Sequence, residues 1–186
     1  MNGWVLPKKA AIGGKEYPIH TDFRDILEIF GYLDDPELPE FIRWQVALAL
    51  FYEGDLPAEH RQEAMEFLAE FLNGGRADAG KPAPRLLDWQ CDCDLIISDV
   101  NRVAGREIRQ EGYVHWWTFL SWFHGIGQGQ LSTLVSIRDK LRRGKKLEGW
   151  ERDFYREHKD RIDLKKPASK EELAEKQRLI AMLDGK

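Results

Sequence analysis

The sequence predicts a mainly α-helical fold, a compact helical domain with a small N-terminal β-hairpin. Apolar residues recur at three- and four-residue steps over most of the chain, which is the spacing of one helix face. Two short extended runs flank a Gly-Gly pair before residue 23, as in a hairpin. The 186 residues suit one compact domain, or one domain with an appendage, and no internal repeat is present.

The predicted hairpin lies in residues 9–23, KAAIGGKEYPIHTDF. Gly13-Gly14 supplies the turn, and Pro18 places the second strand at an edge. Asp22 is positioned to cap the following helix, FRDILEIFGYL, which Gly31 and then Pro36 bring to an end.

Three helices are predicted in the middle of the chain. Residues 41–52 are apolar almost all round, which indicates a buried central helix. Pro57 opens the next helix, and residues 73–85, NGGRADAGKPAPR, have the composition of a mobile surface loop. A helix over residues 88–104 follows. The apolar stripes of the last two helices are Ala64, Met65, Leu68, Phe71 and Leu72, and then Trp89, Cys93, Ile96, Val100 and Val103.

The C-terminal third contains three further predicted helices. One spans residues 131–141, a second carries Trp150, Phe154 and His158, and a capping box at residues 169–172 opens the last. We expect residues 1–166 to form a single helical domain and residues 167–186 to form a helical arm. Removal of the arm should lower the melting temperature by only a few degrees, because a short helix alone contributes little core.

The net charge of −4 hides an asymmetry along the chain. Residues 1–137 carry 12 Lys and Arg against 21 Asp and Glu, whereas residues 138–166 carry 12 against 7. An acidic body disfavours a dedicated duplex-binding protein. Absence of a long apolar run or a signal-peptide pattern disfavours a membrane protein and favours the cytoplasm.

The aromatic segment at residues 111–127, EGYVHWWTFLSWFHGIG, is the most unusual part of the sequence. If the segment is one helix, His115 and His124 are nine residues apart and point to opposite sides, which disfavours a shared metal ion. Ordinary core is the favoured interpretation. A partner-binding face remains open, because Trp and Phe dominate interface hot spots, whereas base stacking lacks nearby Lys or Arg.

The aspartates of residues 88–104 suggest a second candidate site. Asp88 and Asp92 are one helical turn apart and could share a cation or raise each other's pKa. Asp88 is also a natural N-cap, and Asp99 can pair with Arg102. Cys91 and Cys93 diverge on a helix, so we expect one buried and one partly exposed thiol instead of a zinc site.

The basic segment offers a third candidate, a docking surface for an acidic partner. Its members are Arg138, Lys140, Arg142, Arg143, Lys145 and Lys146. A solvated helical surface with internal ion pairs is the ordinary interpretation of such a run. No motif for a metal, cofactor or catalytic nucleophile appears in the sequence.

Several of these residues together resemble the bacteriophage gene-product-fifteen family over about residues 5–145. The shared patterns are Asp88-Trp89-x-x-Asp92-x-x-x-Ile96, His115-Trp116-Trp117-x-Phe119, Ile137-Arg138, and an N-terminal stretch from Ile12-Gly13-Gly14-Lys15 to Asp22-Phe23-Arg24. The family is encoded in the tail-morphogenesis region of long-tailed phages, near the tape-measure gene.

The resemblance implies a non-enzymatic, tail-assembly-chaperone-like protein of phage or prophage that binds the tape-measure protein or another tail protein and could self-associate. It suggests that Asp88, Asp92, His115, Trp116 and Trp117 hold two helices together or form a binding face, and we expect His115 to contact Asp88 or Asp92. Two alternatives stay open: a metal-dependent hydrolase or nuclease using Asp88 and Asp92, and a nucleic-acid-binding protein using Arg138 to Lys146.

Overall fold

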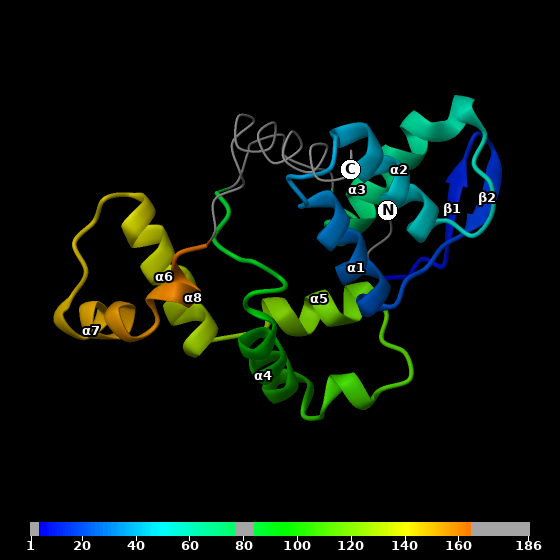
Figure 1. Ribbon diagram of the computed structural model, residues 1–186. Helices are drawn as coiled ribbons and strands as arrows, with labels where there is room; N and C mark the ends of the chain where they lie inside the picture. Colours follow the sequence, from blue (N-terminus) through cyan, green and yellow to red (C-terminus); the bar gives the residue numbers. More distant parts are fainter. Residues whose placement is uncertain (1–3, 77–83, 165–186) are drawn as a thin grey trace, which may run out of the picture.

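The computed structural model describes residues 4–76 and 84–164, and within these ranges the fold is mainly helical with one two-stranded antiparallel hairpin (Figure 1). This confirms the predicted fold class. The centre of the expected loop at 73–85 and the expected arm at 167–186 lie outside the described residues. The elements in chain order are β1 (Lys9–Ile12), β2 (Lys15–Pro18), α1 (Phe23–Leu33), α2 (Glu40–Phe51), η1 (Ala58–His60), α3 (Arg61–Leu72), α4 (Cys93–Ala104), η2 (Ile108–Gln110), α5 (Trp116–His124), α6 (Gln130–Arg142), α7 (Gly149–Glu157) and α8 (Lys159–Ile162).

The hairpin and first helix form as their local sequence predicts. Ile12 pairs with Lys15 across the turn, where Gly13 and Gly14 both have positive φ angles, of 55° and 75°. Such a turn matches the twist of the two strands and favours glycine. Asp22 caps α1 by accepting a hydrogen bond of 3.0 Å from the Arg24 amide. The helix ends at Leu33, so Gly31 lies within it.

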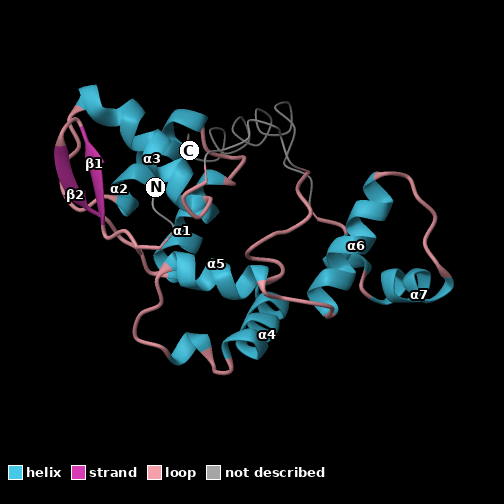
Figure 2. Cartoon of the chain, turned by 180° about the vertical axis from the view of Figure 1, so that it is seen from behind, coloured by secondary structure: helices cyan, strands magenta, loops and turns pink. Residues whose placement is uncertain are grey.

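One large apolar core joins the hairpin to α1–α5. In Figures 1 and 2, α1–α3 and the hairpin lie at one end of the molecule, α4 and α5 in the middle, and α6–α8 at the other end. Aromatic rings dominate this core: Phe23 and Phe119 stack with centroids 4.9 Å apart, and Phe51 lies 5.0 Å from Phe71. The largest fully buried side chain is that of Trp116.

A second and much smaller cluster holds α6–α8 together. Its buried members are Leu134, Ile137 and Ile162, with Leu147 and Phe154 packed partly buried against them. The structure therefore has two apolar clusters of unequal size within the described residues. No helix in residues 4–76 and 84–164 is both long and apolar enough to cross a bilayer.

Three local expectations were wrong. Helix α2 is not buried all round, since only Ala47, Leu48 and Phe51 are buried and Phe41 is 69% exposed. Helix α4 begins at Cys93, because residues 89–92 form a turn. Because of that turn, residues 89–92 do not take the helical positions expected for a helix from residue 88. As a result both cysteines are exposed and Asp92 points inward.

The aromatic segment also differs from the helix expected over residues 111–127. Only Trp116–His124 is α-helical, and the preceding residues up to His115 are not. His115 instead forms an isolated antiparallel bridge with Asp22, and the Trp116 amide donates to the Thr21 carbonyl at 2.7 Å. Long-range backbone pairing with the start of α1 therefore takes precedence over local helix propensity here.

Candidate functional site

Asp92 and Arg138 form a buried bidentate ion pair. The Arg138 guanidinium donates to the two Asp92 carboxylate oxygens at 2.6 and 2.9 Å. Asp92 is 0% exposed and Arg138 only 5% exposed. A planar guanidinium matches the two oxygens of a carboxylate in this geometry. Because both charges are buried away from water, each would be left uncompensated without the other.

Arg138 uses all of its donors within the protein. Besides Asp92, its nitrogens donate to the carbonyl oxygens of Leu86, Arg161 and Ile162 at 2.6–3.0 Å. These acceptors lie before α4 and at the end of α8, whereas Arg138 itself is on α6. Arg138 thus ties the α6–α8 end to the rest of the chain, and it belongs to the interior instead of the predicted basic docking surface.

Asp88 organises the turn before α4. Its Oδ1 accepts hydrogen bonds from the Gln90 and Cys91 amides at 3.0 and 2.8 Å, and its own amide donates to Asp92 at 2.9 Å. Burial raises the pKa of Asp88, but the hydrogen bonds from Cys91 and the neighbouring Arg85 guanidinium outweigh burial, so the pKa lies below its ordinary value. The expectation of a raised pKa at this residue was wrong.

The acidic pair therefore has a structural explanation. Arg138 neutralises Asp92, and backbone amides and Arg85 occupy Asp88. Among the described residues, no three His, Cys, Asp or Glu side chains gather in a way that could hold a metal ion. The hydrolase hypothesis loses the free carboxylate pair on which it rested. The expected pairing of Asp99 with Arg102 is confirmed at 3.1 Å.

His115 caps α5 and does not bridge to α4. Its Nδ1 accepts a hydrogen bond from the Trp117 amide at 3.0 Å, so the ring proton lies on Nε2, which donates to the Pro7 carbonyl at 3.0 Å. Both ring nitrogens are used, and the expected contact with Asp88 or Asp92 was wrong. Burial lowers the pKa of His115, against the opposing effect of the Pro7 hydrogen bond.

Trp116 and Trp117 connect α5 to the end of α3. Their indole Nε1 groups donate to the carbonyl oxygens of Leu72 and Phe71 at 3.0 and 2.9 Å. The last carbonyl groups of a helix have no hydrogen-bond donor within it, so the two indoles supply donors for the C-terminal carbonyls of α3. Both side chains are buried, and they bridge α5 to α3.

The remaining basic residues lie on the surface, partly neutralised. Lys140 pairs with Glu151 at 2.6 Å, and Asp139 pairs with both Arg142 and Arg143. Lys145 and Lys146 form no ion pair within the described residues. The uncompensated positive charge is therefore concentrated at the end of α6, which weakens the nucleic-acid hypothesis based on the whole run from Arg138 to Lys146.

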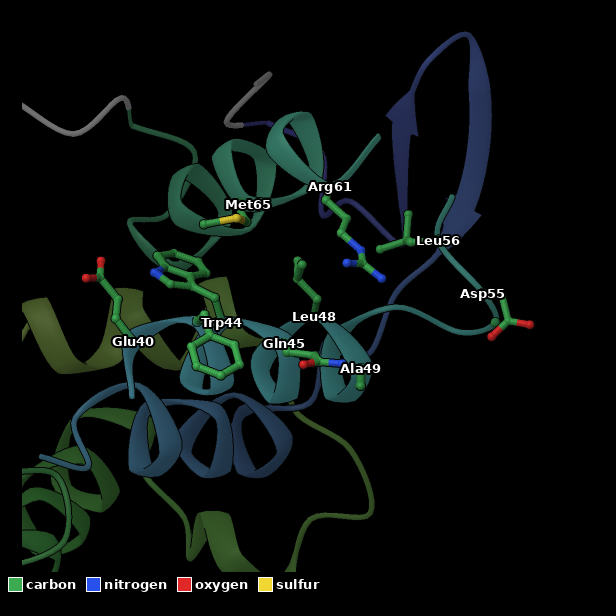
Figure 3. A pocket seen from close by; sticks show the side chains of 11 residues that line it. Glu40, Trp44, Gln45, Leu48, Ala49, Asp55, Leu56, Arg61 and Met65 are labelled. Carbon is green, nitrogen blue, oxygen red and sulfur yellow. The ribbon is translucent and has the colours of Figure 1, made fainter. Parts of the chain in front are cut away.

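A partly apolar groove of about 770 Å³ lies between α2 and α3 (Figure 3). Phe41, Trp44 and Leu48 line it from α2, Met65 from α3, and Leu56 from the connecting segment. We call this the α2–α3 groove. Sequence reasoning missed it, although Phe41, Trp44 and Leu48 are spaced by three and four residues on one face of α2, which runs from exposed Phe41 through half-buried Trp44 to buried Leu48.

The charged residues that line the α2–α3 groove are Glu40, Asp55 and Arg61. Glu40 and Asp55 lie at its opposite ends, and Arg61 projects near the Asp55 end (Figure 3). Residues 34–66 carry nine Asp and Glu against two Lys and Arg, a net charge of −7 with His neutral. An apolar groove formed by an acidic segment of the chain is suited to an amphipathic segment that has basic residues beside its apolar stripe.

Comparison with known proteins identifies one family. The family model described as Bacteriophage Gp15 protein matches residues 5–164. This match covers nearly all of the described structure, including the groove, the Asp92–Arg138 pair and the aromatic segment. No curated protein and no solved structure matches the chain.

Proposed function

Because this chain belongs to the bacteriophage Gp15 protein family, we propose that it is a non-catalytic tail-assembly factor that holds a helical segment of the tape-measure protein. The α2–α3 groove is the observation that supports this role. A protein that keeps a long helical client soluble needs an exposed apolar surface, and Phe41, at 69% exposure, supplies part of one. The complex forms in the host cytoplasm before the tail is complete.

The groove has the dimensions for a short helical segment. Its lining residues on α2 run from Glu40 to Ala49, which corresponds to a length of about 15 Å at 1.5 Å per residue. A helix of this length presents anchors at i, i+3 or i+4, and i+7 to an apolar groove. The net negative charge of residues 34–66, which form the groove, favours clients with Lys or Arg beside those anchors and disfavours acidic helices.

Co-purification tests the proposed function. Fragments of the phage's tape-measure protein are expressed with the full chain, and the retained fragment is identified. A Phe41→Ala, Trp44→Ala variant should lose at least tenfold in affinity, since the exposed ring of Phe41 and the half-buried ring of Trp44 are both removed from the groove lining. Tyr32→Ala is the matched control, because Tyr32 is a 37% exposed aromatic on α1 that does not line the groove.

Two outcomes would contradict the proposed function. One is that no tape-measure fragment binds the parent protein. The other is that the groove variant, shown to be folded by its circular dichroism and melting temperature, binds a fragment as tightly as the parent. Equal weakening by Tyr32→Ala would assign the effect to general loss of apolar surface and would also count against the groove.

A further inference from the structure

We propose that the α2–α3 groove also receives a second copy of this chain, through the end of α6 and the start of α7. We call residues 141–150 the α6–α7 tip. The contact joins two different surfaces, so it is head-to-tail. A groove that holds the tip of another copy cannot hold a client segment at the same time, so the two occupants compete, but self-association can be measured without any client.

The α6–α7 tip displays apolar side chains. Trp150 is 56% exposed and Leu141 is 36% exposed. Their neighbours Lys140 and Glu151 form an ion pair of 2.6 Å that joins α6 to α7. Glu151 is 2% exposed and also accepts a hydrogen bond from the Glu148 amide at 2.8 Å, so its side chain is anchored between α6 and the start of α7. The tip is thus held in place while Trp150 remains in contact with solvent.

The charge of the tip is opposite to that of the groove. Residues 141–150 contain four Lys and Arg and one acid, Glu148, whereas residues 34–66, which form the groove, have a net charge of −7. Arg142 and Arg143 share the single carboxylate of Asp139, and the two lysines of the tip form no ion pair among the described residues. Opposite potentials on two apolar surfaces steer them together and set their orientation.

The position of the two surfaces makes the contact intermolecular. The groove lies between α2 and α3 at one end of the molecule, and α6 and α7 lie at the other end in both views (Figures 1 and 2). A tip therefore meets the groove of another copy. A contact between unlike surfaces leaves one groove and one tip free on every assembly, which then grows until it closes into a ring or extends as a filament.

Sedimentation velocity of the purified full chain, from about 1 to 100 µM, tests this proposal. The parent should form assemblies that grow with protein concentration. These assemblies should shrink as ionic strength rises from about 0.1 to 1 M, because the Debye screening length falls from about 10 to 3 Å. A groove variant, Phe41→Asp with Trp44→Ala, should remain monomeric. A tip variant, Trp150→Ala with Lys145→Glu and Lys146→Glu, should also remain monomeric. The tip residues are exposed, so the tip variant keeps its buried clusters.

Mixing the two variants gives the decisive result. Each retains one intact surface, so an equimolar mixture should form a dimer and nothing larger. A mixture that remains monomeric, or a parent that is monomeric throughout, would overturn the proposal. So would assembly of either folded variant to the size of the parent. If deletion of residues 167–186 abolishes assembly while both surface variants still assemble, the arm is the interface and the proposal is wrong. Client binding is measured separately with tape-measure fragments, so each proposal can fail alone.

Discussion

The buried pair of Asp92 and Arg138 shows how one arginine can fix the position of three segments. Such a pair is not a large net source of stability, because removing both charges from water is costly. The pair matters for stability mainly when only one of its two charges is removed. Once one partner is removed, the other remains buried without compensation.

We expect Arg138→Leu to lower the free energy of unfolding by about 3–5 kcal/mol, because Asp92 then remains buried and unpaired. The double variant Asp92→Leu, Arg138→Leu should lose less than the sum of the two single losses. Urea unfolding measures the free energy of unfolding of the two single variants and the double variant. Arg142→Ala is the control, and its exposed pair with Asp139 should be worth no more than about 1 kcal/mol. Additive losses would show that the two residues are not energetically coupled.

His115 makes stability depend on pH. Burial lowers its pKa in the folded protein, so the unfolded chain binds the proton more readily and stability falls as pH decreases. The contribution is complete above about pH 6.5, the unperturbed value, and is lost as pH falls through the folded pKa. Protonation also removes the Nδ1 acceptor that caps α5.

His115→Asn separates the two effects, because asparagine retains a capping oxygen and does not titrate. Denaturant unfolding at pH 7.5 and pH 5 should show a smaller loss of stability in the variant than in the parent, by about 1 kcal/mol. Other titrating groups contribute equally to both proteins and cancel in the comparison. An identical pH dependence would show that His115 does not govern it.

At the scale of elements, the hairpin turn docks on the start of α3. The Gly13 amide donates to Glu63 at 2.9 Å, and a Cβ at Gly13 would lie 2.1 Å from His60 Nε2. Gly14 has a similar positive φ angle, yet a Cβ there meets nothing within 4 Å. The two glycines therefore share a conformational requirement but differ in their surroundings.

Alanine at either position should cost about 1–2 kcal/mol for the left-handed conformation. We expect Gly13→Ala to cost more than Gly14→Ala, because His60 must also move away from Tyr17. Thermal unfolding of both variants measures the difference. Adding His60→Ala should remove the excess cost of Gly13→Ala, and equal melting temperatures for the two single variants would refute this account of the turn.

Elements set by short-range signals were predictable, and elements set by distant contacts were not. The Gly13-Gly14 turn and the Asp22 cap lie within a few residues of what they organise, so the hairpin turn and the start of α1 were predicted, although β2 ends at Pro18. The start of α4 depends on Arg138 drawing Asp92 inward, and the start of α5 depends on the bridge to Asp22. No local pattern contains those partners.

The groove was missed for a different physical reason. An apolar surface that faces solvent has the same composition as one that faces the core, so residues 41–52 were predicted to be buried. Hydrophobicity alone does not say whether a partner within the chain covers a stripe. Among the predicted site residues, the structure connects Asp88 with Asp92 and His115 with Trp117, but it does not bring the two groups together.

For the whole molecule, the unequal clusters predict unequal local stability. The α6–α8 cluster has three buried apolar residues, whereas the larger core spans the hairpin and α1–α5. The free energy of local unfolding rises with the number of buried contacts in a region. Amide hydrogens of α6–α8 should therefore exchange with solvent through openings of lower free energy than those of α1 and α5. Hydrogen exchange with mass spectrometry measures the protection of both regions. Uniform protection across the two regions would contradict this, and Arg138→Leu should widen the difference.

The long-range pairing of residues 21–23 with residues 114–116 has a consequence for the protein during its synthesis. The Val114 amide donates to Asp22, 92 positions earlier, and the Phe23 amide donates to the Val114 carbonyl. At about 5–20 residues per second, the ribosome needs roughly 5–20 s to make the chain between these partners. During that interval α1 emerges without the tryptophans that later cover it. Nascent chains that end before Trp116 should therefore be the ones that need host chaperones.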